Sequence, residues 1–116
     1  VTGKNEPLTF RVWEADAPLR TAAFGVQVPD TDRTVVPDVL VIPCVGFRVV
    51  DGRPYRLGYG GGFYDRTLAL PAFRTTGSVG VAYDQAETSS WAPDVWDMPL
   101  SMLLTPSRCI VAMASP

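Results

Sequence analysis

The stretch from Arg56 to Arg66 reads RLGYGGGFYDR and is the most distinctive part of the chain. Its four glycines, at positions 58, 60, 61 and 62, follow a predicted strand and precede a run that suits a helix, Phe63 to Leu70, stopped by Pro71. Successive backbone N–H groups of such a loop can face an anion, and a helix start adds favourable charge. The spacing is neither the dinucleotide fingerprint nor the P-loop. The stretch predicts a phosphate site, with a tight turn after a hairpin as the alternative.

Short apolar runs on both sides of this stretch predict the strands of a sheet. Val39 to Pro43 is a continuous, mostly β-branched run, which indicates a central strand covered on both faces. Phe47 to Arg56 is typical of a hairpin, because Asp51-Gly52 tolerates the positive φ angles of a tight turn. Glu14 to Pro37 is predicted to be a long surface loop. Further strands are predicted at Leu8 to Trp13, Ser78 to Tyr83 and Met102 to Leu104, and Cys109 to Ala114 is either another short strand or a segment that packs on the surface.

The composition indicates one globular domain over residues 1–116. Hydrophobic residues make up 47% of the chain and charged residues 19%, and a chain of this length buries roughly two-thirds of its unfolded surface. The 10 glycines and 11 prolines are about 18% of the residues, against a usual ~12%, which favours many turns and few long helices. Covered strands with helical connections predict an α/β sheet, although a single convincing helix cannot cover both of its faces.

Charge, histidine content and cysteine spacing exclude several classes of function. Acidic and basic residues are interspersed with a net charge of −2, so a nucleic-acid groove is not expected. No apolar run approaches the ~20 residues of a membrane span. The sequence has no His, so Ser-His and Cys-His catalysis are excluded and any metal must be held by oxygen. Cys44 and Cys109 are predicted to be buried free thiols in a reducing cytoplasm.

The stretch from Arg56 to Arg66 resembles the signature of the 5-formyltetrahydrofolate cyclo-ligases, also called methenyltetrahydrofolate synthetases. The resemblance implies a three-layer α/β/α sheet, related to the sugar-phosphate isomerase and CoA-transferase sheets and incomplete at the N-terminus. It also implies an ATP- and Mg²⁺-dependent enzyme of one-carbon metabolism that converts 5-formyltetrahydrofolate to 5,10-methenyltetrahydrofolate and releases ADP and phosphate. It extends, in the family's order, through Leu8 to Trp13, Phe24 to Pro29, Val39 to Phe47, Gly80 to Asp84 and Trp96 to Leu100.

The resemblance also implies roles for individual residues. Arg56 and Tyr64 would be catalytic, and Asp65 and Asp97 would bind Mg²⁺, which prefers hard oxygen ligands. Three alternatives stay open: a solvated charge for Arg56, complementing the helix dipole for Asp65, and a loop cap for Asp97. Tyr83 and Trp96 are expected to be core or interface aromatics. The implied nucleotide-binding residues are Arg56, Leu57, Gly58, Tyr59, Gly60, Gly61, Gly62, Phe63 and Tyr64, and the implied folate-binding residues are Tyr59, Gly60, Gly61, Gly62, Phe63 and Phe24.

Members of this family are usually well over half again as long as the 116 residues of this chain. The resemblance therefore implies a C-terminal part whose activity requires an N-terminal part with a first helix, its nucleotide-binding Lys and Arg, and the first strands. That segment, or a second copy, would cover the exposed sheet. A catalytically inactive nucleotide- or folate-binding module, or an assembly surface, is the alternative function.

Overall fold

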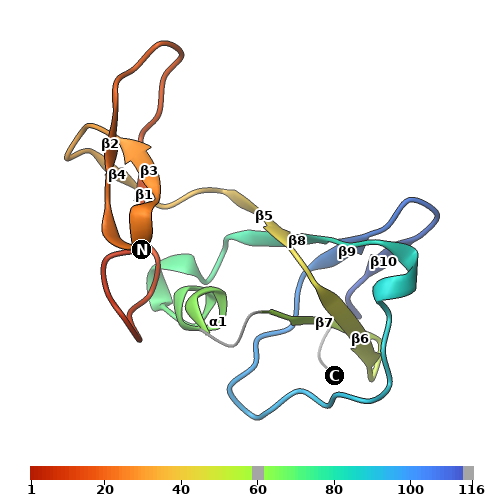
Figure 1. The fold of residues 1–116 in the computed structure, drawn as a ribbon. Coiled ribbons are helices and arrows are strands. Elements are labelled where there is room, and N and C mark those ends of the chain that lie inside the picture. Colours follow the sequence, from red (N-terminus) through yellow and green to blue (C-terminus); the bar gives the residue numbers. More distant parts are fainter. Residues whose placement is uncertain (59–61, 114–116) are drawn as a thin grey trace. The chain divides into compact units, whose positions relative to one another are not determined.

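Figure 1 shows the fold in a computed structural model, which describes residues 1–58 and 62–113. The chain divides into two compact units. The first unit comprises Val1–Pro37 and Gly61–Arg74, and the second comprises Asp38–Gly60 and Thr75–Pro116. The single domain predicted over residues 1–116 stays a prediction. The described residues form a sheet-dominated α/β structure with one short α-helix.

A four-stranded sheet organises the second unit, with the strand order β10-β9-β8-β5 (Figure 1). The pairs β5 with β8 and β8 with β9 are parallel, whereas β10 runs antiparallel to β9. The structure confirms β5, β8 and β9, which were expected from their apolar runs, within a few residues, and β10 confirms the strand alternative for Cys109 to Ala114. Their bounds are Val39–Pro43 for β5, Gly77–Val81 for β8, Met102–Leu104 for β9 and Cys109–Val111 for β10.

Strand β5 corrects the prediction of a central strand covered on both faces. It lies at one end of the strand order and pairs with β8 alone in the described part of the chain. Leu40 and Ile42 are buried, whereas Val39 and Val41 are 56% and 66% exposed. A β-branched run makes a strand suitable for burial on both faces, but packing decides whether the second face is covered.

A tight hairpin, formed by β6 (Gly46–Val50) and β7 (Arg53–Leu57), confirms the signal at Asp51-Gly52. Asp51 and Gly52 have φ angles of 53° and 76°, the left-handed values that a two-residue primed turn requires at both central positions. Phe47 of β6 is fully buried. The hairpin leads directly into the glycine-rich stretch and so fixes where that stretch begins.

The first unit contains a hairpin where a long loop was predicted. Strand β2 (Leu19–Thr21) pairs antiparallel with β3 (Gln27–Pro29), joined by the 3-10 turn η1 (Ala23–Gly25). The prediction of a structureless segment from residue 14 to 37 is therefore wrong. Both strands are three residues long and mostly exposed, so the sequence lacks the apolar alternation by which strands are recognised.

A second strand pair in this unit is also short. Strand β1 (Phe10–Arg11) pairs with β4 (Thr34–Val35), so the strand predicted over Leu8 to Trp13 is reduced to two residues. The helix α1 (Phe63–Leu68) ends two residues before the predicted Leu70, and the 3-10 turn η2 (Pro71–Phe73) follows. Phe73 is buried, and its ring centroid lies 6.1 Å from that of Phe10. Residues 1–37 and the helical segment thus pack within one unit.

The core of the second unit contains Ile42, Phe47, Leu100 and Leu103, each at most 1% exposed. The predicted burial of Cys109 is wrong, because Cys109 is exposed. Tyr83, which precedes the 3-10 turn η3 (Asp84–Ala86), and Trp96 are also exposed, so neither is a core aromatic, and the interface role expected as the other possibility stays a prediction. Both cysteines are free thiols, as predicted. Among the described residues, no helix is long and apolar enough to span a membrane.

Candidate functional site

The glycine-rich stretch joins β7 to α1, and the structure describes its two ends. Tyr59, Gly60 and Gly61 lie outside the described residues, so the predicted contacts of these three with nucleotide and folate stay predictions. Gly62 precedes the helix with φ 68° and ψ 15°, a left-handed conformation in which a side chain is strained. A Cβ at Gly62 would also lie 3.2 Å from a guanidinium nitrogen of Arg66. The backbone therefore requires glycine at this position.

At the other end of the stretch, Arg56 folds over Gly58. A Cβ at Gly58 would overlap the Arg56 guanidinium, so the absence of a side chain leaves room for that group. Arg56 Nε donates a hydrogen bond to the carbonyl oxygen of Pro43, at 3.0 Å, where β5 ends. Arg56 is half-buried. This anchored position differs from the freely solvated charge that was the alternative for Arg56.

Cys44 lies beside this arginine. Burial raises the pKa of the Cys44 thiol, and the positive charge of Arg56 together with its hydrogen bond offsets part of that rise. The backbone N–H of Cys44 donates to Val81 O at 2.9 Å, which continues the β5–β8 pairing past the end of β5. Arg56 is therefore positioned by the carboxyl end of a parallel strand, the edge of an open α/β sheet where ligands generally bind.

Phe63, Tyr64 and Asp65 form the first turn of α1, and all three are half-buried. Thr67, fully buried, fixes the helix: its Oγ1 donates to Phe63 O at 2.6 Å and accepts from Leu8 N at 2.7 Å. Asp65 stands where a negative charge complements the helix N-terminus. This agrees with the alternative reading of Asp65, and its predicted metal role stays a prediction.

Asp97 closes a turn. Its Oδ2 accepts a hydrogen bond from Asp94 N at 2.7 Å, and its own N–H donates to Asp94 O at 3.1 Å. The alternative reading of Asp97 as a loop cap is therefore confirmed. Asp65 belongs to the first unit and Asp97 to the second. Within residues 1–58 and 62–113, no group of three or more His, Cys, Asp and Glu residues is placed to hold a metal ion.

Phe24 occupies the tip of the β2–β3 hairpin. Its φ of 59° and ψ of 23° are left-handed, which is uncommon for an aromatic residue, and the side chain is 71% exposed. Gly25, also left-handed with φ 73°, completes the turn. A strained, exposed aromatic ring at a hairpin tip suits contact with a flat ring system. The structure thus gives Phe24 an accessible position, and its predicted folate contact stays a prediction.

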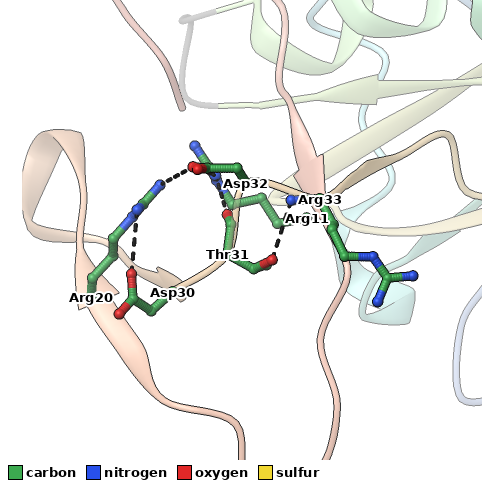
Figure 2. A network of polar contacts seen from close by, with 6 residues as sticks. All are labelled: Arg11, Arg20, Asp30, Thr31, Asp32 and Arg33. Carbon is green, nitrogen blue, oxygen red and sulfur yellow. Dashed lines mark hydrogen bonds and ion pairs between the residues drawn. The ribbon is translucent and has the colours of Figure 1, made fainter.

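Two arginines and two aspartates form a charged network near the base of the same hairpin (Figure 2). Arg20 lies 3.3 Å from Asp30 and 3.8 Å from Asp32, and Arg11 lies 3.7 Å from Asp32. The guanidinium of Arg11 also donates to Thr31 O. The guanidinium of Arg33 points away from these ion pairs.

A cavity of about 130 Å³ opens beside this network, lined by Val12, Pro18, Pro29, Glu14, Thr31 and Arg33 among others. This cavity was not predicted from the sequence. Its lining comes from the segments on either side of the β2–β3 hairpin, which was predicted as loop, and Pro29 is the one lining residue that lies in a strand of that hairpin. The sequence signals are the prolines at the two ends of the hairpin, Pro18 and Pro29.

These observations define an α/β protein in which a glycine-rich stretch runs from a hairpin beside the end of a parallel strand into a helix. A profile of the 5-formyltetrahydrofolate cyclo-ligase family matches residues 2–106. The chain belongs to this family.

Individual relatives agree with this assignment. The chain is 42% identical over 106 residues to the 5-formyltetrahydrofolate cyclo-ligase of Escherichia coli K12, covering 87% of this chain and 57% of the relative. It is 35% identical over 102 residues to the Haemophilus influenzae enzyme of the same name, covering 84% and 53%. The solved structure of Aquifex aeolicus 5,10-methenyltetrahydrofolate synthetase is similar with a TM-score of 0.65 and 30% identity, covering 97% of this chain and 56% of that one. The chain spans about half the length of these relatives.

Proposed function

We propose that this chain takes part in the ATP-dependent conversion of 5-formyltetrahydrofolate to 5,10-methenyltetrahydrofolate, with release of ADP and phosphate. The observation that carries the proposal is the family match over residues 2–106, which includes the glycine-rich stretch and the residues that flank it. The names of the relatives give the substrate and product: the E. coli protein is a 5-formyltetrahydrofolate cyclo-ligase, and the A. aeolicus protein is a 5,10-methenyltetrahydrofolate synthetase.

In the proposed reaction the formyl oxygen of the substrate attacks the terminal phosphorus of ATP, and ADP leaves. The N10 nitrogen then attacks the activated formyl carbon and loses its proton to solvent, and the bond from that carbon to the phosphorylated oxygen breaks to release phosphate. Phosphoryl transfer needs positioning and charge stabilisation more than a protein nucleophile. The absence of His in the sequence is compatible with this chemistry.

Arg56 and Tyr64 are the proposed catalytic residues. Arg56 would pair with a phosphate as a planar, permanently charged donor, and its hydrogen bond to Pro43 O already restricts the side chain. Phe24 would contact the pteridine ring from the hairpin tip. The backbone of the glycine-rich stretch would approach the nucleotide phosphates, because Gly58 leaves room for the Arg56 guanidinium and Gly62 allows the turn into α1.

Asp65 and Asp97 are the residues that would hold Mg²⁺. Two carboxylates together with phosphate oxygens form the donor set that this hard cation takes in nucleotide sites. Oδ2 of Asp97 accepts the hydrogen bond of the turn, and carboxylate oxygens can accept more than one partner, so the donor chemistry fits. The ion would neutralise developing phosphate charge.

We also propose that the remaining part of a cyclo-ligase, or a second copy, covers the exposed face of the four-stranded sheet and completes a three-layer arrangement. Val39 and Val41 of β5 and Val111 of β10 are 56%, 66% and 60% exposed on the described chain. Val41, Val79, Met102 and Val111 lie in register across the four strands, which places them on one face. Apolar surface of this kind usually marks an interaction site.

The experiment is an activity assay of the 116-residue chain, alone and mixed with the part of the E. coli relative that this chain does not match. ATP, Mg²⁺ and 5-formyltetrahydrofolate are supplied, and the absorbance of the methenyl product is followed. Turnover is expected only in the mixture, because the isolated chain lacks charged phosphate contacts that the other part would supply, and each such contact is worth about 1.5–3 kcal/mol. Turnover by the isolated chain, shown intact by mass spectrometry, would contradict the requirement for a second part. No turnover in either sample, with ATP still bound, would favour the inactive binding module.

A further inference from the structure

Residues 88–100 form an irregular segment that is attached to the β6–β7 hairpin. The segment contains no helix or strand, and Figure 1 draws it in light blue between η3 and β9. Both of its ends are held by backbone hydrogen bonds to the hairpin. Thr88 N donates to Phe47 O at 2.9 Å, and Leu100 N donates to Pro54 O at 2.8 Å. The hairpin therefore determines where this segment begins and ends.

Arg48 of β6 holds the segment between these two ends through its side chain. Its guanidinium Nη1 donates to Trp91 O at 2.8 Å, across 43 positions of sequence, and the arginine is half-buried. None of the ion pairs found within residues 1–58 and 62–113 involves Arg48. A charged donor makes a stronger hydrogen bond to a carbonyl than a neutral donor does. The guanidinium therefore fastens the backbone of the segment to the hairpin.

The place of attachment lies beside Arg56 on the same hairpin. Phe47 is paired directly with Arg56 in the hairpin register, and Arg48 occupies the next position on β6. Residues paired across an antiparallel ladder have Cα atoms about 4.5–5.5 Å apart. One short hairpin thus supports both Arg56, the proposed phosphate contact, and the segment that carries Asp97, a proposed Mg²⁺ ligand.

The turn that contains Asp97 has hydrogen bonds that are local. Asp97 Oδ2 accepts from Asp94 N, and Asp97 N donates to Asp94 O. These two bonds define the shape of the turn but do not attach it to the sheet. Val95 and Trp96, at the tip of the turn, are 90% and 69% exposed, so the tip is little supported by packing. Where the turn lies therefore depends on the attachments of the segment on its two sides.

We propose that Arg48 is a positioning residue for the metal–nucleotide site, because its hydrogen bond to Trp91 O holds Asp97 at a fixed place relative to Arg56. This inference rests on the proposed function for the roles of Asp97 and Arg56. Mg²⁺ requires nearly ideal octahedral geometry, so a carboxylate on a mobile backbone binds it weakly. Arg48 acts through the segment and is not itself a ligand of the ion or the nucleotide.

The first test measures the order of the segment by hydrogen exchange of the 116-residue chain. Arg48→Met keeps an apolar stem and removes the donor, so exchange over residues 89–98 should become about tenfold faster, the effect of losing one charged hydrogen bond. Arg48→Lys retains a donor and should restore part of the protection. Exchange in the β6–β7 hairpin should stay unchanged, which shows that the variant is folded. Arg74→Met, an equal change of charge at an exposed residue of the other unit, should alter neither region.

The second test uses the chain mixed with the remaining part of the E. coli relative. In Arg48→Met the Mg²⁺ concentration for half-maximal turnover should rise about threefold or more, whereas kcat at saturating Mg²⁺ should stay within about twofold of the wild type. Calorimetry of Mg²⁺-dependent ATP binding should show the same weakening without turnover. Arg48→Lys should lie between Arg48→Met and the wild type. Asp97→Asn, which loses the charge of the proposed ligand, is measured alongside.

Unchanged exchange over residues 89–98, an unchanged Mg²⁺ requirement in Arg48→Met, or an equal loss in Arg48→Lys would each overturn the proposal. A fall in kcat that saturating Mg²⁺ does not restore would also overturn it, because it indicates a general loss of structure. Failure of the proposed function has a different signature: Mg²⁺-dependent ATP binding is weaker in Arg48→Met, but the wild-type mixture does not convert 5-formyltetrahydrofolate. No Mg²⁺-dependent ATP binding by the wild-type mixture would overturn both.

Discussion

At the scale of single residues, Gly62 is the position where the backbone restricts the sequence most clearly. Its φ of 68° makes a Cβ unfavourable, so Gly62→Ala should lower the free energy of unfolding by about 1–2 kcal/mol. Gly77→Ala is the matched control, because its Cβ would make an ordinary contact of 3.7 Å with Val39 and its φ is not left-handed. Urea denaturation of both variants measures the difference. Similar urea midpoints for the two variants would show that the backbone before α1 rearranges to accept a side chain at position 62.

Asp97 allows the structural and metal roles of one carboxylate to be separated. Asp97→Asn keeps a side-chain oxygen that can accept the hydrogen bond from Asp94 N, so the stability of the turn should change little. If Asp97 binds Mg²⁺, the same variant should require a higher Mg²⁺ concentration for activity of the completed enzyme, because a ligand charge is lost. An unchanged Mg²⁺ titration would show that Asp97 stabilises the turn and does not bind Mg²⁺. Asp97→Ala should weaken both properties.

At the scale of elements, the buried hydroxyl of Thr67 links α1 to the N-terminal segment. Thr67→Val keeps the shape of the side chain but leaves Leu8 N without its acceptor, which should cost about 1–3 kcal/mol. Thr67→Ser retains the hydroxyl and should lose much less. Thermal or urea unfolding of the two variants gives the comparison, and equal loss in both would point to the methyl group of Thr67.

Elements were predictable from the sequence where local chemistry alone specifies them. Asp51-Gly52 determines a tight turn, and the apolar runs at Val39–Pro43 and Met102–Leu104 determine strands with the predicted bounds. The β2–β3 hairpin was missed because an exposed aromatic residue in a left-handed conformation is not a recognisable turn signal. The exposure of one face of β5 was not predicted, because tertiary packing, and not the strand's own residues, decides whether that face is covered.

The candidate site was predictable to a similar extent. The glycine-rich stretch and its arginine could be recognised from the residue pattern, whereas the hydrogen bond from Arg56 to Pro43 and the turn closed by Asp97 depend on tertiary geometry. The cavity lined by Glu14 and Arg33 could not be predicted, because it forms only when the two strands of an unrecognised hairpin pair.

At the scale of the whole molecule, the exposed face of the four-stranded sheet predicts self-association. A charge on this face, Val41→Glu, should shift the chain toward monomer, since burying an unpaired charge is costly. Val95→Glu places the same charge on a valine that is 90% exposed outside the sheet, and the association should persist. Sedimentation velocity over a range of concentrations measures both. If all three proteins are monomers, a second copy does not cover this face.

The parallel pairing of β5 with β8 has a consequence for the order in which the molecule folds. Val39 pairs with Gly77, 38 positions further along the chain, whereas the β6–β7 hairpin closes between Val50 and Arg53. Local hairpins form in about 1–10 μs, and non-local pairing is slower because loop closure carries an entropic cost. The glycine-rich stretch lies inside the loop that β5 and β8 close. In a nascent chain, the β6–β7 hairpin that precedes this stretch is therefore complete before β5, whose end anchors Arg56, has paired with β8.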